Sequence, residues 1–164
     1  MKAIVLAVAA CGALPTALSA QRYDYHLLLD SSVTAAMAAL ERSGHRPERA
    51  VVRPDGVTEA RFSTQLPDSS GTPARGELRV VVLSRADSII RIFAQASAER
   101  GDTAAVREAG LYFIRHLTRV FGRPAHVEQD YDWCWTPRRR FVSVSMERAG
   151  AALTLNVAYD WPLR

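Results

Sequence analysis

The chain has 164 residues, 48% hydrophobic and 23% charged, which suits one folded domain with a sizeable core and excludes a largely disordered chain. The formal net charge is +4, and every basic residue except Lys2 is arginine. These arginines are interleaved with acidic residues and form a run only at Arg138, Arg139 and Arg140, so the sequence predicts no binding to nucleic acid.

The N-terminal residues 1–20 have the anatomy of a secretory signal peptide. Lys2 supplies a positive charge, residues 3–13 form an apolar run, and residues 18–20 end in the small pair Ser-Ala. The apolar run is too short to anchor the chain across a bilayer. We therefore expect residues 21–164 to be a single extracytoplasmic domain, either periplasmic or secreted.

An alternative processing route is open at Cys11. Residues 8–11, Val-Ala-Ala-Cys, resemble a bacterial lipobox, which implies that Cys11 becomes the lipidated first residue of the mature chain. Only ten residues precede Cys11, and the apolar run continues beyond it, so the sequence favours cleavage near residue 20. Contact with a membrane is expected only if Cys11 is lipidated.

The first half of the mature chain predicts one helix followed by strands. Residues 23–29 alternate loosely and predict either a strand or the approach to a helix. Ser31 and Ser32 are good helix caps, and a helical stripe follows, consisting of Val33, Ala36, Met37 and Leu40. Residues 53–56 predict a turn, and a strand is expected at 58–66. After a polar loop, residues 78–84 and 88–96 predict a β-hairpin.

The second half repeats this order with a longer helix. An apolar stripe within residues 102–124 predicts a core helix that is capped by Asp102 and ends at Gly122; it consists of Val106, Ala109, Phe113, Leu117 and Val120. A strand is expected at residues 127–135. A second hairpin is predicted from residues 141–147 and 151–159.

The two halves together predict an α+β fold with an internal duplication. Each helix stops at a glycine that is closely followed by a proline, Gly44 with Pro47 and Gly122 with Pro124, and three predicted strands follow. The expectation is two degenerate α-β-β-β repeats, about 31–96 and 102–159, that form one antiparallel sheet with both helices on one face. The alternative is a non-repetitive α+β domain in which the two helix stops are coincidental.

Motifs for several enzyme classes are absent from the sequence. It contains no Gly-x-Ser-x-Gly elbow, phosphate-binding loop, dinucleotide-binding glycine pattern or His-Glu-x-x-His motif. The histidines lie in different predicted elements without metal-ligand spacing, and His116 is expected to be a half-exposed surface residue. The sequence therefore predicts no metal site and no cofactor.

Cys134 is the only cysteine that remains after cleavage near residue 20, which excludes an internal disulfide. A nucleophilic cysteine needs an activating partner, and His126 is the nearest histidine in the sequence. Free cysteines are among the most buried residues of proteins. We expect Cys134 to be buried and slow to react.

Residues 130–135 have an unusual composition for a strand. Asp130, Asp132 and Cys134 alternate with Tyr131, Trp133 and Trp135. The two carboxylates could hold a cation or act as an acid–base pair. The preferred interpretation places the aromatic rings against the helices and the acids on the opposite, open face of the sheet.

Two functions remain open at this point. The first is a small exported binding or structural module, monomeric and without a cofactor, that contacts a protein or cell-envelope partner. Its expected contact residues are on the open sheet face or in the arginine turn, and they are Asp130, Asp132, Ser143, Ser145, Asn156, Arg138, Arg139 and Arg140. The alternative is a small extracytoplasmic hydrolase that uses Asp130, Asp132 or Cys134.

Overall fold

The computed structural model describes residues 22–98, 103–128, 132–137 and 140–160. The predicted signal peptide, Cys11 and the helix cap Asp102 lie outside these ranges, as do Asp130, Arg138 and Arg139. In the described part of the chain, none of the helices is long and apolar enough to cross a membrane.

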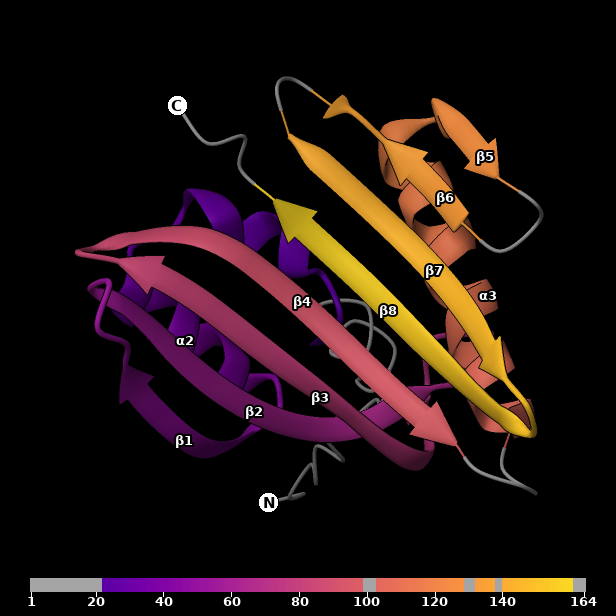
Figure 1. The fold of residues 1–164 in the computed structure, drawn as a ribbon, viewed down its shortest axis with the longest axis horizontal. Coiled ribbons are helices and arrows are strands. Elements are labelled where there is room, and N and C mark those ends of the chain that lie inside the picture. The colour runs from indigo at the N-terminus through magenta and orange to yellow at the C-terminus, as the bar shows by residue number, and fades with distance from the viewer. Residues whose placement is uncertain (1–21, 99–102, 129–131, 138–139, 161–164) are drawn as a thin grey trace, which may run out of the picture.

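The described residues form an α+β fold built on one antiparallel sheet, as the sequence predicted. The sheet has eight strands in the order β1-β2-β3-β4-β8-β7-β6-β5 (Figure 1). β4 and β8 are neighbours although they are far apart in the sequence, so the sheet joins the two halves of the chain. The strands are β1 (Arg46–Val52), β2 (Val57–Pro67), β3 (Pro73–Arg85), β4 (Ser88–Ala98), β5 (His126–Glu128), β6 (Asp132–Trp135), β7 (Phe141–Ala149) and β8 (Ala152–Asp160).

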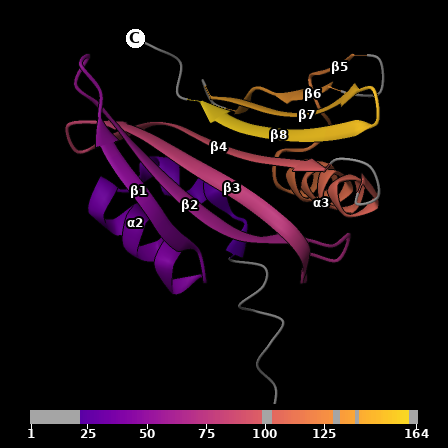
Figure 2. The same ribbon diagram turned by 60° about the horizontal axis from the view of Figure 1, so that its bottom comes forward.

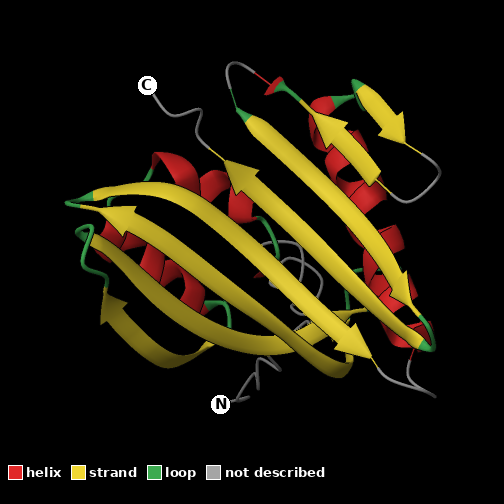
Figure 3. Ribbon diagram, viewed as in Figure 1, coloured by secondary structure: helices red, strands yellow, loops and turns green. Residues whose placement is uncertain are grey.

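Within the described residues, three helices accompany the sheet: the 3-10 helix η1 (Tyr25–Asp30), α2 (Val33–Arg42) and α3 (Thr103–Phe121) (Figure 3). The predicted cap Ser32 accepts a hydrogen bond from the backbone N–H of Ala35 at 3.3 Å and starts α2. The α3 stripe is buried from Val106 to Leu117, but Val120, which was expected in the core, is 41% exposed. The ambiguous residues 23–29 contribute to η1 rather than to a strand.

Two strands were missed by the sequence analysis, and each half has four strands instead of three. β1 is exposed along its whole length because it is an edge strand, so it shows no apolar alternation, and a bulge follows Pro47. The segment predicted as one strand at 127–135 contains two, β5 and β6, which pair with each other. All three residues of β5 are exposed, so it too lacks a buried face.

A hydrophobic cluster joins residues of all three helices to β2, β3, β4, β6, β7 and β8. α3 contacts strands of both halves, whereas α2 contacts β1 and η1, and Figure 2 shows α2 alongside β1 and α3 alongside β8. Trp135 is 1% exposed in this core, and its indole N–H donates to the carbonyl of Gly122 at 3.0 Å. A Cβ on Gly110 would lie 2.4 Å from Sδ of Met146, so a glycine lets α3 approach β7 closely.

Candidate functional site

The sheet face opposite the hydrophobic cluster is called the outer face here. On β6, Trp135 lies in the core and Trp133 packs against it, as the sequence predicted. Asp132 and Cys134 alternate with these rings and are half-buried on the outer face. Most side chains of this face are less buried than those on the core side, which makes the outer face a candidate binding surface.

A row of polar side chains crosses the outer face from β6 to β3. The strand register sets Asp132 opposite Ser145, Ser145 opposite Asn156, Asn156 opposite Gln95, and Gln95 opposite Arg79. The amide of Gln95 donates to Asn156 Oδ1 at 3.0 Å, and Asn156 Nδ2 lies 3.5 Å from Ser145 Oγ. We call these five residues the outer-face row.

The outer-face row contains three of the predicted contact residues, Asp132, Ser145 and Asn156. Gln95 and Arg79 were missed, because only the pairing of β4 with β8 brings the first half of the chain beside the second. The one sign that Gln95 belongs to the outer face is its place in the alternating pattern of β4, where it takes an exposed position between two buried alanines. Ser143, also predicted, lies in the adjacent row opposite Cys134.

The outer face is hollowed over β2, β3 and β4. A cavity of about 390 Å³ lies there, and its lining includes the apolar side chains Val81 and Phe93 and the polar side chains Arg61, Arg79 and Gln95. Val81 is 8% exposed, which makes it part of the floor. We call this cavity the outer-face hollow. It adjoins the outer-face row, because Arg79 and Gln95 belong to both.

Glu59 supports one wall of the outer-face hollow. It is 8% exposed, and its carboxylate accepts hydrogen bonds from Arg53 Nε at 2.9 Å and Arg61 Nε at 2.7 Å. Hydrogen bonds from Arg53 and Arg61 lower the pKa of Glu59, so the group is ionised at neutral pH. Arg61 is thereby held in a fixed position beside the hollow, while its side chain stays 54% exposed.

Arginines reach the outer face from every strand of the first half. Arg79 is the most accessible of those with an ion pair, since its side chain is 72% exposed and its Nε lies 2.9 Å from Glu77 Oε1. The strand register places the others on the same face, and they are Arg46, Arg49, Arg61 and Arg91. The lining of the hollow also contains Glu48 and Glu59, so this half of the outer face offers a mixed rim, with more cationic than anionic groups, around an apolar floor.

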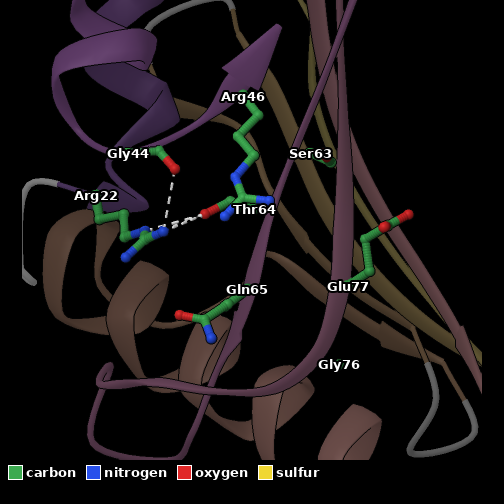
Figure 4. Close-up of a pocket in the computed structure, with 8 residues that line it drawn as sticks. All are labelled: Arg22, Gly44, Arg46, Ser63, Thr64, Gln65, Gly76 and Glu77. Atoms are coloured by element: carbon green, nitrogen blue, oxygen red, sulfur yellow. Dashed lines mark hydrogen bonds between the residues drawn. The ribbon is translucent and has the colours of Figure 1, made fainter. Parts of the chain in front are cut away.

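A second cavity of about 340 Å³ lies near the edge of β2 and β3 (Figure 4). Arg22 crosses it, and its Nε and Nη2 donate to Thr64 Oγ1 at 3.0 and 2.7 Å. Nη2 also donates to the carbonyl of Gly44 at 3.2 Å. These contacts attach the start of the described chain to β2 and to the turn after α2, so we assign Arg22 a structural role.

Cys134 is half-buried, which corrects the expectation of a buried thiol. Cys134 lies on the outer face of the sheet, where side chains are less buried than in the core. His126 is its cross-strand neighbour on β5. Burial, followed by the charge of Asp132, raises the pKa of the Cys134 thiol, so the thiol is protonated at neutral pH. A nucleophilic cysteine has the opposite shift, so Cys134 does not fit the role of a nucleophile.

Arg140 is the described member of the predicted arginine turn. Its side chain is 19% exposed and forms an ion pair with Asp30 at the end of η1. Arg140 therefore connects the segment before β7 to the N-terminal helix. The expectation that this turn meets a partner still concerns Arg138 and Arg139, which lie outside the described residues.

One group of side chains has the composition of a metal site. Asp24, His26 and His116 each place a potential ligand atom within 4.8 Å of the others. His116 was expected to be a half-exposed surface residue, yet its side chain is only 13% exposed. No local spacing could have revealed the group, because His116 lies on α3 and the other two residues lie at η1.

The outer face thus offers charge, hydrogen bonds and a hollow, whereas the described residues around Cys134 offer no activated nucleophile. The charges, hydrogen-bonding groups and hollow of the outer face are the features from which a function can be inferred. No family model matches the chain, and neither does any curated protein sequence or any solved structure.

Proposed function

We propose that this chain is a small exported binding module that holds an acidic, partly apolar segment of a partner protein against its outer face. The observation that carries the proposal is the outer-face hollow, where three arginines, Arg53, Arg61 and Arg79, outnumber the two glutamates Glu48 and Glu59 around an apolar floor. The partner supplies carboxylates to the arginines and an apolar side chain to the floor. The outer-face row continues the contact surface toward β6.

The chemistry of the hollow favours carboxylates over other groups. Guanidinium groups bind carboxylates through paired, charge-assisted hydrogen bonds, and they are enriched in protein interfaces. Phe93 and Val81 provide apolar area between these charges. Gln95 and Asn156 can bind backbone amides of an extended segment, at the cost of their mutual hydrogen bond.

We further propose that the domain consists of two related units, α2 with β1–β4 and α3 with β5–β8, and that both helices cover the same face. The strand order, with β4 and β8 at the centre and β1 and β5 at the edges, supports a duplication. The cluster that contains residues of both helices supports a common face. Such an arrangement leaves the outer face available to a partner.

Export is part of the proposal and rests on the N-terminal sequence. Intact mass of the chain recovered outside the cytoplasm should correspond to a start close to residue 21. A lipidated species that begins at Cys11 would replace this cleavage site by a membrane anchor. A full-length cytoplasmic product would contradict export.

A pair of defined peptides tests the binding surface. The acidic probe is a fluorescein-labelled peptide of alternating aspartate and leucine, and its comparator has lysine in place of aspartate. Fluorescence anisotropy should show binding of the acidic peptide that weakens with added salt, because the contact depends on charge. The lysine peptide should not bind.

Charge reversal on the outer face provides the decisive variant. The double substitution Arg46→Glu with Arg79→Glu alters exposed residues of one cross-strand line and should weaken the acidic peptide roughly tenfold or more. The matched control reverses Arg107 and Arg115, both exposed on α3, and should leave binding unchanged. Equal effects of the two double variants, or no binding of the acidic peptide, would contradict the proposal.

A further inference from the structure

Asp24, His26 and His116 converge where the N-terminal segment meets α3. Asp24 precedes η1, His26 lies within η1, and His116 lies on α3. Oδ1 of Asp24 is 2.7 Å from Nε2 of His116, and the two imidazole rings are 5.9 Å apart between centroids. Each residue has a potential ligand atom within 4.8 Å of the other two.

Three buried polar atoms of this group make no hydrogen bond within the described chain. Oδ1 of Asp24, Nδ1 of His26 and Nε2 of His116 are buried and make no hydrogen bond of acceptable geometry there, despite the close approach of Asp24 to His116. Asp24 is the residue before η1, yet its side chain does not cap that helix. Buried polar atoms normally have partners, so three such atoms in one place indicate a missing ligand.

Aromatic neighbours restrict the movement of both rings. His116 stacks on Tyr112, with 5.5 Å between ring centroids and 12° between ring planes. His26 packs edge-on against Phe121 at 5.4 Å. The side chains of His116 and Asp24 remain 13% and 17% exposed, so the group lies just below the surface and an ion can enter.

We propose that Asp24, His26 and His116 form a binding site for a divalent transition-metal ion of the zinc class. An ion at their centre satisfies all three buried atoms, whereas an Asp24–His116 ion pair leaves Nδ1 of His26 without a partner. In a tetrahedral zinc site the ligand atoms are about 3.3 Å apart, which small side-chain rotations of this group can reach.

The donor set selects the class of metal. Two imidazole nitrogens and one carboxylate oxygen suit zinc and its first-row neighbours, whereas calcium and magnesium prefer oxygen ligands alone. Three protein ligands leave one tetrahedral position for water or for a group of a partner.

The bound ion connects η1 to α3. The ligands come from segments that are distant in the sequence, so binding adds a link that the unfolded chain lacks and stabilises the folded state. This inference is independent of the outer face and of the acidic partner. It concerns a separate part of the surface.

Zinc titration of the metal-free mature chain tests the site. Calorimetry should show one Zn²⁺ bound per chain, and zinc should raise the Tm of the protein. Co²⁺ should give visible d–d absorption without the sulfur-to-metal charge-transfer band that a cysteine ligand produces. Failure to bind zinc would overturn the proposal.

Single substitutions assign the ligands. Asp24→Asn, His26→Gln and His116→Gln should each weaken zinc binding roughly 100-fold or more and abolish the rise in Tm. The matched control is His126→Gln, whose side chain is 69% exposed beside Glu128, and it should bind zinc as the wild type does. Tm values of the metal-free variants, expected near that of the metal-free wild type, show that each is folded. Binding that survives all three ligand substitutions, or that is lost in His126→Gln, would refute the assignment.

Discussion

The two halves of the sheet share a core but differ on the outer face. In the first half, β2, β3 and β4 have 11, 13 and 11 residues, and they carry the arginines and the outer-face hollow. In the second half, β6, β7 and β8 have 4, 9 and 9 residues, and the outer-face row there contains the smaller side chains Asp132, Ser145 and Asn156. The two halves therefore contribute to one core and differ in the side chains of their outer faces.

The two α-helices also differ, in their length and in the strands that they contact. α3 has 19 residues and contacts strands on both sides of the β4–β8 junction, whereas α2 has 10 residues and contacts β1 and η1. The second half therefore contributes the helix that holds the sheet together. The first half contributes the outer-face hollow, to which we assign the proposed binding. Stability and binding should respond to changes in different halves.

The largest expected effect is the loss of Trp135 in the second half. Trp135→Ala should reduce the free energy of unfolding by about 3–5 kcal/mol, because it empties a core position and removes the hydrogen bond to Gly122. Phe62→Ala in the first half, at a residue 3% exposed, should cost slightly less, since no hydrogen bond is lost with it. Urea unfolding measures both.

Trp133→Ala is the internal control for this comparison. Trp133 packs against the core but is only half-buried, so its substitution should cost clearly less than that of Trp135. Equal losses for the two tryptophans would mean that both rings are equally important to the core. That result would contradict the assignment of Trp135 as the anchor of β6.

Acid should destabilise the first half through His45. Its Nδ1 lies 3.2 Å from the carbonyl of Leu40 and its Nε2 lies 2.9 Å from the Tyr25 hydroxyl, so the neutral ring has partners for both nitrogens. Burial lowers the pKa of His45 to about 4. The unfolded chain takes up a proton near pH 6.5 and the folded chain does not, so stability should fall by roughly 3 kcal/mol between about pH 6.5 and about pH 4.

Unfolding at several pH values, compared between variants, isolates this contribution. Carboxylates also titrate at the acidic end, so the relevant quantity is the difference between variants. His45→Gln should show a shallower loss of stability over this pH window than the wild type. The control His126→Gln, at an exposed histidine, should follow the wild type. Parallel curves for all three proteins would exclude His45 as the source.

A smaller effect is expected at the start of α2. Ser32→Ala removes the acceptor for the Ala35 N–H and should cost about 1 kcal/mol of unfolding free energy. Ser32→Gly should cost less than Ser32→Ala, because glycine is tolerated at a helix cap. Denaturant midpoints distinguish the two. Identical stability of Ser32→Ala and the wild type would show that α2 does not depend on its cap.

The smallest expected effect is at Asp132 on the outer face. Its Oδ1 is buried without a hydrogen bond among the described residues, so Asp132→Ala removes a group that contributes little to the folded state. The Tm should stay unchanged or rise slightly, with a change in unfolding free energy of about 0.5 kcal/mol or less. A large loss of stability would show that Asp132 has a structural partner.

Local patterns in the sequence determined the elements that have one buried face. The stripe from Val106 to Leu117 predicted α3, and the alternation of Trp133 and Trp135 with Asp132 and Cys134 predicted which side of β6 meets the core. These predictions succeeded because burial on one face leaves a regular period in the chain. β1 and β5 are exposed throughout and carry no such period, so their existence depended on pairing with a neighbour.

Only the tertiary structure decided which residues meet from distant parts of the chain. The pairing of β4 with β8 brings Gln95 beside Asn156, and the position of α3 brings His116 beside Asp24 and His26. Neither approach leaves a spacing that can be recognised along the chain, because each depends on the order of strands in the sheet and on how a helix packs. The sequence therefore determined the elements with a buried face, while their assembly created the outer-face row and the proposed metal site.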